Sequence, residues 1–223
     1  MKRSHRLMPL LAGVGVGLFG FARAQDSPVL ITSSTAIAAD NAAYEGALLV
    51  VQGCTVTIEG DHGFVGLTVV SNGLVEFAGT NLAVGALELS DTSRFTLAGG
   101  AVLEATNEVR LSDASTFVVL GKNTGAQVDG AWQGAGGQIR AASLMIAAGA
   151  RLTADEQGYG AGAGPGAGLA VDSGAGHGGR GGERGAPGGG SYGSASEPAD
   201  LGSGGVGSSM WGSWTSGGLG GGA

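Results

Sequence analysis

The residues of this chain best suited to bind an ion are two aspartates in equivalent turns. Asp91 lies within residues 90–93 and Asp113 within residues 112–115, and each turn follows an apolar run of the same spacing. If the two turns stack, the carboxylates lie close together and offer the oxygen ligands that Ca²⁺ prefers. Asp and Ser also suit solvent-facing turns that hold no ion. Asp91 and Asp113 are thus candidate metal ligands, weighed against a purely structural role.

Two tryptophans near the C-terminus offer a second kind of chemistry. Trp211 and Trp214 could present their indole faces to a sugar ring, or could pack against the surrounding glycines. His177 has no histidine or cysteine partner at ligand spacing, so we expect a structural imidazole there, and we assign His62 to a loop. Matches to Gly-x-Gly-x-x-Gly, such as residues 160–168, lack the strand, helix and acidic residue of a dinucleotide site. We therefore predict no catalytic residues and no cofactor, apart from the Ca²⁺ considered above.

Five stretches of the chain repeat apolar residues at offsets 0, 2, 8 and 10. The sets are Leu48, Val50, Val56, Ile58; Leu67, Val69, Val75, Phe77; Leu87, Leu89, Phe95, Leu97; Val109, Leu111, Phe117, Val119; and Leu144, Ile146, Leu152, Ala154. Each pair of offsets places two side chains on one face of a strand, because the pleat has a period of two residues. Between the paired strands lie residues that tolerate left-handed backbone, which predicts a sharp corner in each unit.

The five units start 19, 20, 22 and 35 residues apart, a spacing that favours stacked rungs. We predict an all-β fold, a right-handed parallel β-helix or solenoid of about five or six rungs followed by a glycine-rich irregular segment. The long last interval leaves open a sixth rung that would include Val128, Trp132 and Ile139. An antiparallel meander is the alternative, because Asn72-Gly73 is also a hairpin signal. The parallel solenoid is favoured because equal rung lengths let like residues stack in columns.

The first 24 residues have the pattern of a Sec-type signal peptide. Lys2, Arg3 and Arg6 precede an apolar stretch over residues 7–21, and Ala22-Arg23-Ala24 ends the segment. We predict cleavage after Ala24, secretion or display at the cell surface, and no membrane span in the mature chain. The mature chain keeps seven Lys and Arg residues against 18 Asp and Glu, a net charge of about −11. That acidity argues against nucleic acid and anionic lipid as partners.

Residues 158–223 differ from the rest of the chain in composition. Of these 66 residues 27 are glycine, and the period-two pattern disappears. Tyr159, Tyr192 and Leu201 stand among the glycines, where a flexible linker would gain nothing from exposing them. We expect close-packed irregular backbone here, with disorder as the alternative. The expected organisation is a signal peptide at 1–24, a lead-in or cap at 25–46, solenoid rungs at 47–157 and the glycine-rich segment at 158–223.

The glycine-rich stretches carry a resemblance. Residues 158–168, 176–182, 189–194 and 201–205, preceded by the rung at 152–158, are similar to the glycine-rich insert of large secreted bacterial β-solenoid proteins. Similar inserts occur in glycine-rich plant and protist surface proteins. The resemblance covers residues from about 138 to 223 and implies a secreted or surface solenoid rather than an activity. In those proteins further rungs follow the insert, so we also expect a continuation beyond residue 223.

These observations favour a secreted or cell-surface structural or adhesion protein without catalytic activity. Its expected partners are extracellular polysaccharide or cell-envelope components. The alternative is a carbohydrate-active β-helix enzyme, a polysaccharide lyase or hydrolase, because pectate lyases and polygalacturonases share this fold. Those enzymes cluster acidic and basic residues on one sheet, whereas here threonine is the most frequent residue at the outward positions of the repeat and acids and bases do not cluster in the sequence. A disordered or non-functional fragment is a third interpretation.

Overall fold

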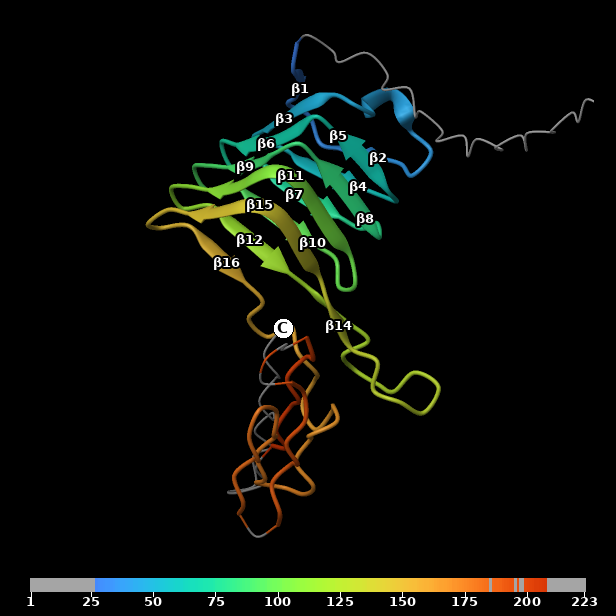
Figure 1. The fold of residues 1–223 in the computed structure, drawn as a ribbon, viewed down its shortest axis with the longest axis vertical. Coiled ribbons are helices and arrows are strands. Elements are labelled where there is room, and N and C mark those ends of the chain that lie inside the picture. Colours follow the sequence, from blue (N-terminus) through green and yellow to red (C-terminus); the bar gives the residue numbers. More distant parts are fainter. Residues whose placement is uncertain (1–26, 185, 195, 197–198, 208–223) are drawn as a thin grey trace, which may run out of the picture.

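The chain folds into an all-β parallel solenoid of about four turns with very little helix. This computed structural model describes residues 27–184, 186–194, 196 and 199–207 (Figure 1). The chain winds around three sides, and each turn pairs with the next through parallel strands. The predicted parallel solenoid is therefore confirmed, and the antiparallel meander is wrong.

Each side of the solenoid is a ladder of strands that lie one turn apart. The first side holds β5 (His62–Phe64), β8 (Asn81–Val84) and the first halves of β11 (Val102–Leu111) and β15 (Gln138–Ile146). The second side holds β1 (Val29–Ile31), β3 (Leu48–Gln52), β6 (Gly66–Val70), β9 (Leu87–Leu89) and the second halves of β11 and β15. The third side holds β2 (Thr35–Ile37), β4 (Thr55–Ile58), β7 (Leu74–Phe77), β10 (Arg94–Leu97), β12 (Thr116–Val119) and β16 (Arg151–Thr153). The 3₁₀ helix η1 (Ala42–Tyr44) lies between β2 and β3.

Inward side chains of successive turns form continuous columns, as the repeat predicts. Leu67 pairs with Leu87, and Leu87 pairs with Val109, so three units place the same repeat position side by side along the axis. All three side chains are buried. On the third side the rings of Phe95 and Phe117 pack with centroids 4.9 Å apart. Burial of these columns removes most of the apolar surface of the repeat from water, which is the main force that holds the turns together.

The first unit departs from the predicted register by one residue. Leu49 and Val51 are the buried residues of β3, whereas Leu48 and Val50 are only half-buried. The cause is the corner that follows, which takes one residue fewer than the later corners before the next inward residue, Val56. The repeat placed Leu49 at an outward position, where an apolar residue is unexpected, and its buried place in the structure explains its type.

The sequence also missed one of the three sides. We predicted two strands per unit, but a third short strand precedes each pair from β5 onward. The apolar residues of this first side are Phe64, Leu82, Val84 and Leu103, spaced too irregularly to stand out beside the main repeat. Counted by complete turns, the solenoid has about four rather than five or six.

The sixth rung that the sequence left open does not form. Residues 120–137, which we call the hairpin arm, leave the solenoid through the antiparallel pair β13 (Gly121–Lys122) and β14 (Ala135–Gly136). The chain then re-enters as β15, whose Leu144 pairs directly with Val109 of the preceding turn. Of the residues assigned to the extra rung, only Ile139 lies in a solenoid strand. The arm is an insertion between two adjacent turns, so it lengthens the interval without adding a rung.

The described part of residues 158–207 contains no helix or strand and projects beyond the last turn (Figure 1). Its backbone is held by hydrogen bonds between extended stretches: Gly174 N–H donates to Gly182, Gly181 to Gly189, and Gly189 back to Gly174, each at 2.9 Å. A Cβ on Gly189 would come within 1.8 Å of the Gly166 carbonyl oxygen. Glycine is required where chains approach this closely.

Candidate functional site

The corner between the second and third sides brings the two candidate aspartates together. Asp91 and Asp113 occupy equivalent left-handed positions with φ of 59° and 57°, and Ser71 takes the same conformation one turn earlier. The Asp91 carboxylate accepts the Ser71 N–H at 2.8 Å, and the Asp113 carboxylate accepts the Asp91 N–H at 3.1 Å. Each carboxylate therefore ties its own turn to the preceding one. In this arrangement the side chains act as structural hydrogen-bond acceptors.

The arrangement of Asp91 and Asp113 can be compared with what a calcium site requires. Across the described residues no group of three or more His, Cys, Asp and Glu side chains is placed to hold a metal ion. Each carboxylate already accepts a backbone N–H, and two side chains supply fewer oxygen ligands than the roughly six to eight that Ca²⁺ takes. Calcium binding at Asp91 and Asp113 stays a prediction.

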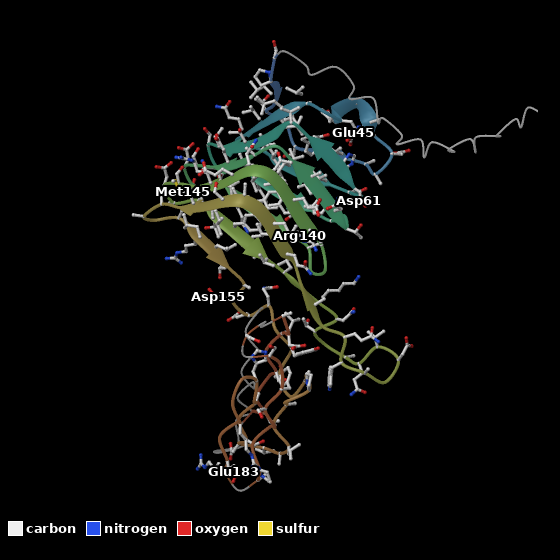
Figure 2. All side chains as sticks on the ribbon, in the orientation of Figure 1. Glu45, Asp61, Arg140, Met145, Asp155 and Glu183 are labelled. Carbon is white, nitrogen blue, oxygen red and sulfur yellow. The ribbon has the colours of Figure 1, made fainter. Side chains whose placement is uncertain are left out.

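A second acidic corner lies between the third and first sides. Asp61 Oδ1 accepts hydrogen bonds from the Thr80 N–H at 2.8 Å, the Asn81 N–H at 2.7 Å and the Thr80 hydroxyl at 2.8 Å. These donors, the Asn81 N–H first among them, hold the pKa of the Asp61 carboxyl below its ordinary value. The charged Asp61 carboxylate thus holds the start of β8 by hydrogen bonds. Figure 2 labels Asp61 in the N-terminal part of the solenoid.

His62 lies in the core rather than in the loop that we expected. It begins β5 and pairs with Leu82 of the next turn, so an imidazole takes a place that leucine fills in the neighbouring turn. Its Nδ1 lies 2.5 Å from a Glu45 carboxylate oxygen and its Nε2 lies 3.1 Å from the Glu59 carbonyl oxygen. Because both ring nitrogens face acceptors, both can donate only when the ring is protonated. The signal in the sequence was the alternation of His62 with Phe64, whose ring stacks on the imidazole.

The glycine-rich segment carries a second group of polar side chains. His177 Nε2 lies 3.0 Å from the Asp200 carbonyl oxygen, and its ring packs edge-on against Tyr192. The Ser203 hydroxyl donates to the Tyr192 oxygen at 2.9 Å and accepts the Gly166 N–H at 2.9 Å. Burial raises the pKa of Tyr192. An activated serine nucleophile needs a hydrogen bond to a base, whereas Ser203 hydrogen-bonds to a tyrosine and a backbone amide. Ser203 and Tyr192 therefore cross-link the segment.

The segment is attached to the hairpin arm through Tyr159. The Tyr159 hydroxyl accepts the Gly134 N–H at 2.8 Å, and Trp132 packs edge-on against the tyrosine ring. The Gly160 N–H donates to the Thr124 carbonyl at 2.9 Å. Trp211 and Trp214, our candidates for sugar contact, lie outside the described residues.

Outward positions of the solenoid form straight polar columns. On the third side one column reads Thr55, Leu74, Arg94, Thr116, Arg151, and the next reads Thr57, Glu76, Thr96, Val118, Thr153. On neighbouring sides the guanidinium groups of Arg110 and Arg140 lie 3.0 Å from Glu108 and Glu104. These two arginines are therefore paired with glutamates of their own chain. On the third side, hydroxyl or charged groups occupy every position of the two columns except Leu74 and the buried Val118.

No family model matches the chain, and neither a curated protein nor a solved structure matches it. The solenoid fold therefore stands on the strand pairing described above. The resemblance to glycine-rich bacterial surface proteins stays a prediction. Within the described residues no helix is long and apolar enough for a bilayer crossing.

Proposed function

We propose that this chain is a secreted or cell-surface structural or adhesion protein that binds polysaccharide or another envelope component through its solenoid surface. The observation that supports this best is the straight register of the third side. Its two outward columns align one residue per turn, at the interval of about 4.8 Å between paired strands, and hold hydroxyl or charged groups at every position except Leu74 and Val118. A periodic ligand such as a polysaccharide can meet such a surface at several turns at once, which strengthens weak single contacts.

The signal pattern at residues 1–24 supports export, although those residues lie outside the described part. The acidic surface supports a partner that is neutral or carries cations, rather than nucleic acid. The packed core and the paired surface charges support a role that depends on shape and surface. The lyase or hydrolase alternative needs acidic and basic side chains that are free to act on a sugar, whereas Arg110 and Arg140 are bound to Glu108 and Glu104.

The test uses the chain as a host secretes it. Binding to a glycan array and to isolated envelope polysaccharide is measured together with the release of unsaturated or reducing ends from polyuronides. We expect binding without turnover. The variant Thr96→Asp, in the middle of the third side, should weaken binding, whereas Thr68→Asp on the second side is the matched control. Turnover of any polymer by the unmodified chain would overturn the proposal.

A further inference from the structure

The two ends of the solenoid carry unpaired strand edges. Among the described residues β15 and β16 pair only with the preceding turn, and β1 and β2 pair only with the following one. Natural sheets protect such edges with short strands, proline or lysine. The edge of β15 is nine residues long and has Arg140 as its one charged residue and no proline. An edge of this kind favours pairing with another strand.

Exposed apolar side chains gather at these same two ends. Of the seven large apolar residues that are exposed in the described chain, Leu30 lies on β1, and Leu144, Met145 and Ile146 lie on β15. Leu30 is 57% exposed and Met145 is 44% exposed. They are the first and last members of one outward column, which runs between them through Val50, Thr68, Glu88 and Arg110. Both ends of this outward column are therefore exposed apolar side chains.

Charge is also unequal along the solenoid axis. Residues 27–93 contain seven acidic residues and no Lys or Arg, whereas the last turn, residues 138–153, contains Arg140 and Arg151 and no acid. On the first side the outward column that ends at Arg140 begins at Gly63, whose N–H donates to the Glu45 carboxylate at 2.9 Å. Figure 2 shows Glu45 and Arg140 at opposite ends of the stack. Arg140 is also paired with Glu104 of its own chain. The last turn of one molecule, with two arginines and no acid, thus complements the first turn of another, which carries Asp40 and Glu45 and no Lys or Arg.

We propose that the last turn docks on the first turn of a second copy of this chain, with β15 pairing in parallel with the partner copy's β1. In the register of the existing columns, Leu144 then meets Val29 and Met145 meets Leu30. Leu144 and Ile146, which are 47% and 44% exposed, lose that exposure on stacking. Such an interface joins unlike ends, so it does not close on itself and produces linear chains of molecules.

The described part of the glycine-rich segment leaves the second side open. Gln157 and residues 159–160 contact Gly121, Thr124 and Gly134 of the hairpin arm, which follows the third side, while residues 144–146 of β15 remain exposed. The docking surface is therefore the second-side edge of β15, and Arg140 lies just before it on the first side. This inference extends the proposed structural role by naming a partner, and it does not depend on which glycan the third side binds.

Two single substitutions test the direction of stacking. Leu30→Asp blocks the first turn and Met145→Asp blocks the last turn, and both side chains point outward, so neither change disturbs the core. Molar mass is followed by sedimentation velocity over a range of concentrations. The unmodified secreted chain should grow in mass with concentration without a fixed stoichiometry. Each variant alone should associate at least about tenfold more weakly, because a charge replaces apolar contact area. An equal mixture of the two should form a dimer and nothing longer, since one open first turn meets one open last turn.

The control is Leu169→Asp in the glycine-rich segment, where Leu169 is 73% exposed and lies on neither end. It should assemble like the unmodified chain. The proposal is overturned if the unmodified chain keeps one monomeric mass at all concentrations, if Leu30→Asp alone still dimerises through two last turns, or if Leu169→Asp abolishes assembly. Glycan binding by the Met145→Asp variant is measured in parallel. Retained binding there would leave the proposed function standing even where stacking fails.

Discussion

At the scale of single residues, the corner between the second and third sides has room only for small side chains at one position of each turn. Cys54, Gly73, Ser93, Ser115 and Ala150 each precede a third-side strand at the same register. A Cβ at Gly73 would lie 2.9 Å from the Val51 carbonyl oxygen, so the column has little room. Cys54 belongs to this column as a small residue, and its thiol hydrogen-bonds to the Ile31 carbonyl.

Two serines of this column differ in a way that predicts opposite effects on stability. The Ser115 hydroxyl donates to the Leu89 carbonyl at 3.4 Å, whereas the buried Ser93 hydroxyl has no partner. We expect Ser93→Ala to raise the free energy of unfolding by about 1 kcal/mol, because it removes an unsatisfied buried hydroxyl. Ser115→Ala should lower it by about 0.5–1 kcal/mol. Urea denaturation followed by circular dichroism compares the two, and a loss of stability in Ser93→Ala would contradict the assignment.

Asp61 predicts an acid-dependent contribution to stability. Its pKa is lowered in the folded state, so its carboxylate stabilises the fold above the ordinary value of 3.8 and loses this effect as the pH falls through the lowered value. Asp61→Asn keeps an oxygen acceptor but no charge. The variant should melt at a lower temperature than the unmodified chain at neutral pH, and the difference should shrink in acid. Melting temperatures measured across pH decide this, with Asp129→Asn in the hairpin arm as the control.

At the scale of elements, the glycine-rich segment is the part that depends most on backbone contact. Extended stretches approach each other closely enough to exchange backbone hydrogen bonds, and aromatic residues such as Tyr159 and Tyr192 hold the stretches at their ends. Glycine here allows close packing of the backbone. A flexible linker can have the same glycine content, so composition alone does not distinguish the two cases.

Two adjacent glycines provide a matched test of this packing. A Cβ at Gly189 would come within 1.8 Å of the Gly166 carbonyl oxygen, whereas a Cβ at Gly190 would meet nothing within 4 Å. Gly189→Ala should therefore force the stretches apart and make the segment sensitive to limited proteolysis. Gly190→Ala should leave the cleavage pattern unchanged. Equal cleavage of the two variants would show that the segment is not packed in this way.

At the scale of the whole molecule, the solenoid is nearly one-dimensional, because each turn contacts only its neighbours. Turns in the middle are paired on two edges, whereas the last turn is paired on one. Stability should therefore fall from the middle towards the last turn. The docking that we propose would remove this difference by giving the last turn a second neighbour.

Truncation of a central and a terminal side chain tests this gradient. Phe95→Ala removes a fully buried ring that packs on Phe117, and it should cost about 3–5 kcal/mol. Leu152→Ala, in the half-buried last turn, should cost about 1–2 kcal/mol. Hydrogen exchange should show lost protection on both sides of Phe95 and only local loss around Leu152. Equal effects at the two positions would contradict a one-dimensional stack.

How much the sequence predicts differs between features. The offsets of Leu67, Leu87 and Val109 predicted columns that the structure confirms, because a period of two and a constant rung length leave few other arrangements. The short corner after β3 shifted one register, and the first side was missed, because its strands are short and irregularly spaced. His62 was assigned to a loop because a single imidazole says nothing about its acceptors until Glu45 and the Glu59 carbonyl are brought beside it.

The sequence by itself determined the fold class, the position of the corners and the stretch in which glycine dominates. These three features follow from the local periodicity of apolar residues and from the backbone freedom of single residues, both of which can be read from short stretches of sequence. Only the tertiary structure decided that Asp91 and Asp113 bind backbone amides of the preceding turn, that residues 120–137 form an arm rather than a rung, and that Leu30 and Met145 end one column. The aspartate contacts and the column join residues some 20 or more positions apart, and such contacts exist only once the turns have stacked. The arm is closed by the pairing of Gly121 with Gly136, which the strand periodicity of the repeat does not reveal.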